Sequence, residues 1–217
     1  MKTYTDFVFD IDGTMLDTER TGVLSLIQTI QELTGRKVSY EEAYGFFGIP
    51  SFLAASRLGY ADEAHFAAVW EEHYQELMYL VTPFPGVVEV LDALKAGGAR
   101  LGVVTSRSKF EIEYDPHLSK LLPRFDAVIC SEDSPRHKPF PDPMLAYFAK
   151  TGATAADTLY VGDTMHDYSC GHDAGCDFAL ADWKGRGMQG IPADYWFSDE
   201  AGLRSLIRLS RFFFSLP

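Results

Sequence analysis

The sequence predicts an α/β fold in which a parallel β-sheet is covered by helices on both faces. The first observation is a series of short apolar runs of strand length, and the second is that each run after the first follows a stretch with helical spacing. Because the runs are apolar throughout, both faces of the sheet are expected to be buried. The runs are Asp6 to Phe9, Leu101 to Val104, Ala127 to Ile129, Leu159 to Val161 and Phe178 to Leu180.

The long interval between the first two runs contains helical patterns and no convincing strand. Its first helix is expected between Gly22 and Gly35, with apolar residues recurring at a spacing of three. These residues are Leu24, Ile27, Ile30 and Leu33. We therefore predict an inserted all-helical domain over residues 17–81 and an α/β core domain over residues 1–16 and 82–217.

Composition limits the possible partners. The chain has 217 residues, is 47% hydrophobic and carries a formal net charge of -12 without a basic stripe, which argues against nucleic acids and anionic membranes as partners. The first ten residues lack a signal or membrane-anchor pattern, so a cytoplasmic location is expected. Cys130, Cys170 and Cys176 form no CxxC pair and are expected to be buried, reduced side chains.

Polar residues follow four of the predicted strands. In open parallel sheets, ligands bind beyond the carboxyl ends of the strands, so these residues are expected to meet at one site. Asp-x-Asp and Gly-Asp patterns are common as helix caps and turns when they occur alone. Their occurrence in order, each after a buried strand, favours an active site. The residues are Asp10, Asp12, Gly13, Thr14, Thr105, Ser106, Lys138, Asp163 and Asp167.

The four carboxylates of this set indicate a metal site. Asp10 and Asp12 lie two residues apart before a glycine that permits a tight turn, and Asp163 and Asp167 lie one helical turn apart. Two like charges at about 4 Å cost roughly 4 kcal/mol at an effective dielectric of 20. A hard divalent cation would offset this repulsion, so we predict that Asp10, Asp12, Asp163 and Asp167 bind Mg²⁺.

These motifs resemble those of the haloacid dehalogenase-like (HAD) hydrolase superfamily, and more closely those of its capped phosphatases in the phosphoglycolate phosphatase and beta-phosphoglucomutase-like group. The segments that carry the resemblance are FDIDGTMLD, VVTS, HKPFPDPM and YVGDTMHD, which span almost the whole chain. The resemblance implies a Rossmann-like core with an all-α cap domain inserted after the first motif.

The resemblance also implies roles for individual residues. Asp10 would attack phosphorus to form an aspartyl-phosphate, while Asp12 would donate a proton to the leaving oxygen and later take one from water. Haloacid dehalogenases lack an aspartate at the position of Asp12, so its presence favours phosphate hydrolysis. Thr105 would bind a phosphoryl oxygen and Lys138 would supply a positive charge. The remaining substrate contacts would come from Gly13, Thr14 and Ser106.

For the metal, the resemblance implies that Asp163 binds together with Asp10 and the main-chain carbonyl of Asp12. Asp167 would bind either directly or through water. The expected activity is Mg²⁺-dependent hydrolysis of a small phosphorylated metabolite, such as phosphoglycolate, a sugar phosphate, a nucleotide or pyrophosphate. A phosphomutase of the beta-phosphoglucomutase type and a non-catalytic phospho-ligand binding module remain as alternatives. Both a monomer and a homodimer are compatible with the sequence.

Two further features follow the second motif. Arg107 is expected either to contact the substrate or to pair with a surface acid, and it is not assigned to the site. Pro116 is expected to break the helix that begins near Lys109, because proline lacks the backbone N–H that a helix requires.

Overall fold

The structure is a computed structural model that describes residues 2–46, 49, 51–185 and 190–211. It divides into two compact units, which are described separately: Met1–Leu16 with Pro83–Pro217, and Asp17–Thr82. No helix within the described ranges is long and apolar enough to cross a membrane.

The first unit is built on a six-stranded sheet with the order β5-β4-β1-β6-β7-β8. All of its strand pairs are parallel, which confirms the predicted α/β class. The sheet extends one strand beyond the five predicted from the sequence. Its strands are β1 (Asp6–Phe9), β4 (Arg100–Val104), β5 (Ala127–Ile129), β6 (Thr158–Gly162), β7 (Asp177–Ala181) and β8 (Tyr195–Phe197).

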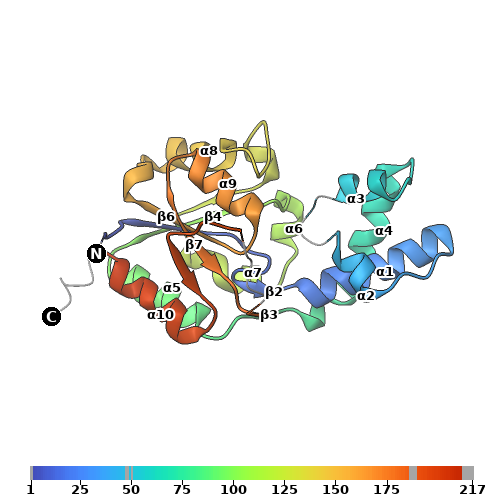
Figure 1. The fold of residues 1–217 in the computed structure, drawn as a ribbon, viewed down its shortest axis with the longest axis horizontal. Coiled ribbons are helices and arrows are strands. Elements are labelled where there is room, and N and C mark those ends of the chain that lie inside the picture. Colours follow the sequence, from blue (N-terminus) through green and yellow to red (C-terminus); the bar gives the residue numbers. More distant parts are fainter. Residues whose placement is uncertain (1, 47–48, 50, 186–189, 212–217) are drawn as a thin grey trace. The chain divides into compact units, whose positions relative to one another are not determined.

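Helices cover both faces of this sheet. Figure 1 shows α8 (Asp142–Thr151) and α9 (Met165–Asp173) on one face, and α5 (Val87–Ala96) and α10 (Glu200–Leu209) on the other. Val8 and Val104 point toward the α8–α9 side, where they join a buried cluster with Tyr147 and Tyr160. Successive residues of a strand point to opposite faces, and in β1 Phe7, Val8 and Phe9 are all buried, so this central strand is covered on both sides.

The segment after β4 is broken, as the sequence predicts. Helix α6 (Lys109–Glu113) ends before Pro116, and α7 (Leu118–Leu121) begins after it. Helix α6 starts with a capping box in which the Ser108 side chain accepts from the Glu111 backbone and the Glu111 side chain accepts from the Ser108 backbone. Short 3-10 segments complete the connections of the first unit: η2 (Leu122–Arg124), η3 (Ser131–Asp133) and η4 (Ala155–Asp157).

The second unit is helical. Its elements are α1 (Glu19–Thr34), α2 (Tyr40–Tyr44), α3 (Ser51–Arg57), α4 (Glu63–Glu76) and the 3-10 segment η1 (Met78–Leu80). Helices α1 and α4 pack through an apolar cluster that includes Leu26, Ile30 and Phe66, and the Trp70 indole donates a hydrogen bond of 2.8 Å to Ser25 Oγ. Two short paired strands, β2 (Leu16–Asp17) and β3 (Thr82–Pro83), lie where the chain passes between the units.

Two details of the predicted first helix are wrong. The helix begins at Glu19, so Gly22 lies inside it. Gly22 is buried, and its N–H donates to the Thr18 carbonyl at 2.9 Å. Only Gly35 marks an end, with a φ of 71° that suits glycine. The buried apolar side chains of this helix are also different from the prediction. They are Val23, Leu26 and Ile30, and only Ile30 belongs to the predicted set.

Candidate active site

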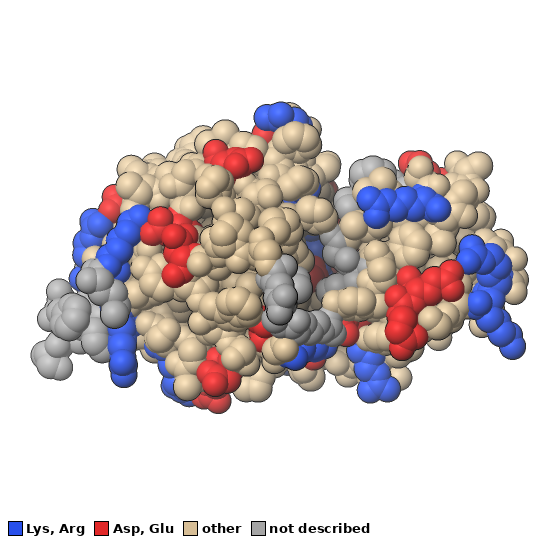
Figure 2. Space-filling view, viewed as in Figure 1, with Lys and Arg blue, Asp and Glu red and all other residues tan. Residues whose placement is uncertain are grey.

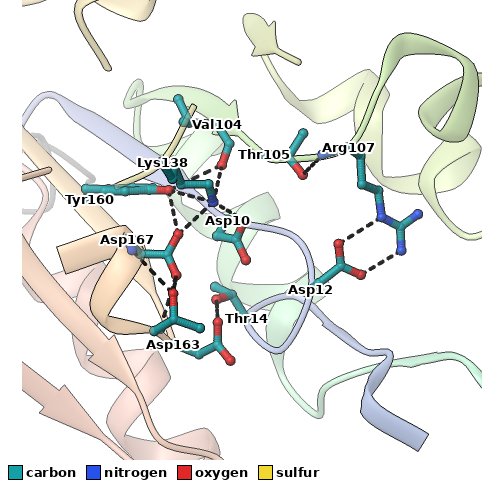
Figure 3. A network of polar contacts seen from close by, with 11 residues as sticks. Asp10, Asp12, Thr14, Val104, Thr105, Arg107, Lys138, Tyr160, Asp163 and Asp167 are labelled. Atoms are coloured by element: carbon teal, nitrogen blue, oxygen red, sulfur yellow. Dashed lines mark hydrogen bonds and ion pairs between the residues drawn. The ribbon is translucent and has the colours of Figure 1, made fainter. Parts of the chain in front are cut away.

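The carboxyl ends of neighbouring strands bring most of the predicted site residues together. Asp10 follows β1 and Thr105 follows β4, while Asp163 follows β6 at the start of the loop that leads into α9. Strand β1 pairs with both β4 and β6, so these three strand ends are adjacent. Figure 3 shows that Asp10 and Asp167 point toward Lys138, while the carboxylate of Asp163 faces Thr14 beside them.

Lys138 lies at the centre of this cluster. Its Nζ donates to Oδ1 of Asp10 and to Oδ1 of Asp167, both at 2.6 Å, and it also contacts the Tyr160 hydroxyl at 3.2 Å and the Val104 carbonyl at 3.3 Å. The side chain is 5% exposed. Burial alone would lower the pKa of Lys138, but the charges of Asp10 and Asp167 outweigh burial and raise it. The amine therefore stays charged.

Asp167 is fully engaged by hydrogen bonds. Its Oδ1 accepts from Lys138 and from the Tyr160 hydroxyl at 3.0 Å, while Oδ2 accepts from the backbone N–H and the hydroxyl of Thr164 at 3.1 and 2.5 Å. Burial would raise the pKa of Asp167, but Lys138 and these hydrogen bonds outweigh it and lower the pKa. Because each carboxylate oxygen already accepts two bonds, Asp167 is better placed to hold Lys138 than to bind a metal directly.

Asp10 and Asp163 are in the opposite situation. Burial raises the pKa of Asp10 to about 7, with Lys138 opposing this shift and the nearby carboxylates adding to it. Burial, followed by the charges of Asp167 and Asp10, also raises the pKa of Asp163. Removing carboxylates from water without enough positive charge beside them disfavours their ionised form. The cluster thus lacks positive charge.

A divalent cation fits this deficit. Asp10, Asp163 and Asp167 each offer one oxygen, and these oxygens lie within 4.8 Å of one another. Carboxylate oxygens are the ligands that hard divalent cations prefer. Asp10 and Asp163 are the two residues that would hold the ion, since Asp167 is occupied. The side chain of Asp12 lies outside this group, and a contribution from its main-chain carbonyl stays a prediction.

Two glycines make room for these carboxylates. A Cβ at Gly13, where φ is 80°, would lie 2.1 Å from Oδ2 of Asp163. A Cβ at Gly162 would lie 2.4 Å from the Cβ of Asp167. Contacts this short cannot occur without displacing the acids. The structure therefore explains why residue 13 is a glycine: without a side chain, its backbone can approach Asp163 closely.

The predicted phosphoryl-binding residues differ in their surroundings. Thr105 is 3% exposed, and its Oγ1 accepts the N–H of Arg107 at 3.2 Å, which leaves the hydroxyl hydrogen available to donate. Thr14 is 2% exposed and its hydroxyl faces Oδ1 of Asp163 at 3.4 Å. Ser106 is exposed. The structure places Thr14 against Asp163 of the cluster and Thr105 at the end of the neighbouring strand β4, whereas substrate contacts by Gly13, Thr14 and Ser106 stay predictions.

Asp12 turns away from the cluster and toward Arg107 (Figure 3). Arg107 Nε donates to Oδ2 of Asp12 at 2.8 Å, and Nη2 donates to Oδ1 at 2.7 Å. Arg107 is 8% exposed, so it is not a surface side chain paired with a surface acid. Its partner Asp12 lies 95 positions away in the sequence, so no local pattern relates the two residues. Its adjacency to the second motif was the available signal.

Trp183 is a second residue that the sequence reasoning did not place. Its indole Nε1 donates to the Thr14 carbonyl at 2.9 Å, and its ring stacks on Phe84 with the centroids 4.9 Å apart. The loop after β7 thus holds the turn that carries Asp10 and Gly13.

On the face drawn in Figure 2, most of the surface of the core unit is uncharged, and acidic and basic side chains lie mainly around its margin.

A parallel sheet with a buried lysine and several aspartates gathered beyond the carboxyl ends of its strands is an arrangement suited to carboxylate chemistry on an anionic substrate. The family model described as haloacid dehalogenase-like hydrolase matches residues 7–181. Pyrophosphatase PpaX from Bacillus velezensis is 30% identical over 196 residues, covering 88% of this chain and 89% of that protein.

Solved structures agree with this match. A protein from Lactobacillus plantarum, named as a candidate phosphoglycolate phosphatase, superposes with a TM-score of 0.85 at 25% identity, covering 94% of this chain and 99% of its own. CbbY from Rhodobacter sphaeroides in complex with phosphate has a TM-score of 0.79 at 18% identity, covering 93% and 99%, which bears on the fold alone. The chain belongs to the haloacid dehalogenase-like hydrolase family. Within that family it is a phosphatase.

Proposed function

We propose that this protein is a Mg²⁺-dependent phosphatase that hydrolyses a small phosphorylated metabolite through an aspartyl-phosphate on Asp10. The observation that supports it most is the position of Lys138, whose Nζ lies 2.6 Å from both Asp10 and Asp167 beside the carboxylate of Asp163. A bound Mg²⁺ would supply the missing positive charge, keeping Asp10 ionised and drawing charge from the phosphoryl oxygens. Nucleophilic attack, proton transfer and binding of the phosphoryl group would be carried out by residues of the chain.

In the first half-reaction, a carboxylate oxygen of Asp10 attacks phosphorus and the bond from phosphorus to the leaving oxygen breaks. Asp12 donates a proton to that oxygen. The Thr105 hydroxyl and the Lys138 amine stabilise the charge that develops on the phosphoryl group. In the second half-reaction, water attacks the aspartyl-phosphate, Asp12 takes a proton from the water, and the Asp10 carboxylate leaves.

The relatives guide the choice of substrates to test. PpaX from Bacillus velezensis is named a pyrophosphatase, and the similar Lactobacillus plantarum protein is named as a candidate phosphoglycolate phosphatase. We therefore rank pyrophosphate and phosphoglycolate ahead of sugar phosphates and nucleotides. We also propose that the helical unit, inserted directly after the first motif, is the cap domain that selects among them.

Phosphate release from this panel, with and without Mg²⁺, tests the proposal. We expect release by the wild type that requires Mg²⁺ and is lost in Asp10→Asn. Turnover that depends strictly on a sugar bisphosphate would favour a phosphomutase instead. Metal binding without release from any substrate would favour a phospho-ligand binding module. Equal activity of the wild type and Asp10→Asn would exclude Asp10 as the nucleophile.

A further inference from the structure

Arg107 lies between two carboxylates of the core unit. It donates two hydrogen bonds to Asp12, at 2.8 and 2.7 Å, and its Nη1 donates to Oδ2 of Asp115 at 2.7 Å. The side chain of Arg107 is 9% exposed, and that of Asp115 is 0% exposed. A planar guanidinium that binds both oxygens of a carboxylate fixes its direction as well as its position. Arg107 therefore sets the direction in which Asp12 points.

The break at Pro116 explains why Asp115 can hold Arg107. Proline disfavours a helical conformation for the residue before it, and α6 has ended at Glu113. Oδ1 of Asp115 accepts the N–H groups of His117 and Leu118 at 2.8 and 3.2 Å, while Oδ2 faces Arg107. The two oxygens thus have separate partners. One fixes the start of the next helical segment, and the other fixes the guanidinium.

Asp12 gains most from this arrangement. Its side chain is 34% exposed, and it projects from the turn after β1 and not from a packed helix or strand. A carboxylate in such a place would otherwise occupy several rotamers. An acid–base group that is misplaced by about 1 Å can lose about a hundredfold in rate, so restricting its rotamers matters for catalysis.

We propose that Arg107 and Asp115 form a positioning relay for Asp12, in which Asp115 fixes the Arg107 guanidinium and Arg107 orients the carboxylate that serves the leaving oxygen. This inference rests on the proposed function, in which Asp12 donates the proton to that oxygen. Arg107 and Asp115 are positioning residues and do not contact the phosphoryl group. Their effect should therefore depend on how much the leaving group needs a proton.

The test compares two aryl phosphates whose leaving groups differ in acidity. Phenyl phosphate has a leaving group that needs a proton, whereas 2,4-dinitrophenyl phosphate has one that departs without it. The parameter is kcat/KM, because it reports the steps up to departure of the leaving group. Arg107→Lys keeps the charge but cannot form the fork. We expect Arg107→Lys to lower kcat/KM for phenyl phosphate about tenfold or more, because general acid catalysis is partly lost. For the dinitrophenyl ester we expect kcat/KM to fall by less than about threefold.

Asp115→Asn provides a second variant that is less demanding for folding. An asparagine carbonyl can still accept the N–H groups of His117 and Leu118, but its NH₂ group would face the Arg107 donor. We expect the same dependence on the leaving group with a smaller amplitude. Arg124→Lys is the matched control, since Arg124 makes a similar fork with Asp92 at 2.6 and 3.1 Å outside the site. Arg124→Lys should leave kcat/KM for both esters unchanged.

An equal loss of kcat/KM for both esters in Arg107→Lys and Asp115→Asn would overturn the relay and indicate a structural role only. Unchanged values for both esters in both variants would overturn it as well. In either case the wild type would still hydrolyse the esters and Asp10→Asn would not, so the proposed function would stand. A wild type as inactive as Asp10→Asn would instead refute the proposed function, and the relay with it.

Discussion

Replacing Lys138 with Met tests the charge balance of the buried cluster. Methionine has nearly the shape of lysine but no charge, so the substitution leaves the carboxylates of Asp10 and Asp167 without the amine that lies 2.6 Å from each. These residues are 5% and 2% exposed, which means that water cannot replace the lost partner. The substitution should therefore lower the stability of the core unit as well as abolish turnover.

The size of the effect follows from the burial. Removing one partner from a buried ion pair costs about 3–5 kcal/mol, and 1 kcal/mol shifts Tm by about 2–4 °C for a chain of about this size. We therefore expect Tm to fall by about 6–20 °C in thermal unfolding with a chelator present. Lys95→Met is the matched control, since Lys95 also lies 2.6 Å from Asp126 but is 40% exposed. It should cost about 1 kcal/mol or less.

The loss of stability in Lys138→Met, relative to the wild type, should also depend on pH. Burial raises the pKa of Asp10 from its usual 3.8 to about 7 against the opposing effect of Lys138, so removing the lysine raises it further. A carboxyl group whose pKa rises on folding loses stability as pH increases from its unfolded to its folded pKa. That interval ends near pH 7 in the wild type and extends higher in Lys138→Met. The variant's deficit should be smaller at pH 5 than at pH 8. A deficit no larger than that of Lys95→Met at pH 8 would refute this reasoning.

Three other substitutions test the rest of the site. Gly13→Ala would place a Cβ 2.1 Å from Asp163 and should reduce turnover by about a hundredfold, whereas Gly152→Ala, with a φ of 72° and no atom within 4 Å, should not change it. Asp163→Asn should weaken Mg²⁺ binding in calorimetry yet raise Tm in chelator, because it removes a partly buried carboxylate whose ionised form is disfavoured by the neighbouring carboxylates; a lower Tm would contradict this. Trp183→Phe keeps the ring but loses the 2.9 Å bond to the Thr14 carbonyl, so urea unfolding should show a loss of about 1 kcal/mol, and no loss would contradict it.

The sequence predicts the sheet well where physical constraints are local. Strands buried on both faces must be apolar throughout, and the polar residues that follow them must lie at one edge of the sheet. Strand β8 was not predicted. It is three residues long and lies at the sheet edge, and its central residue, Trp196, is 51% exposed, so it lacks the burial on both faces that marks the inner strands. The start of α1 was misplaced because burial overrides the low helix propensity of Gly22.

The parts of the site that sequence reasoning missed depend on contacts between distant segments. Arg107 pairs with Asp12 across 95 positions, and the Trp183 indole reaches the Thr14 carbonyl across 169. No spacing rule relates such residues, since the sheet order brings their loops together. The occupation of Asp167 by Lys138, Tyr160 and Thr164 has the same origin. Residue types at strand ends identify the chemistry, and the fold decides which carboxylate has which partner.

Capture of the covalent intermediate tests the central claim most directly. The wild type is mixed with Mg²⁺ and its best substrate, quenched in acid during turnover, digested, and analysed by mass spectrometry. We expect one phosphoryl group on the peptide that contains Asp10, removable by hydroxylamine as expected for an acyl phosphate and absent from Asp10→Asn. Phosphorylation of a different residue, or persistent turnover by Asp10→Asn, would contradict it.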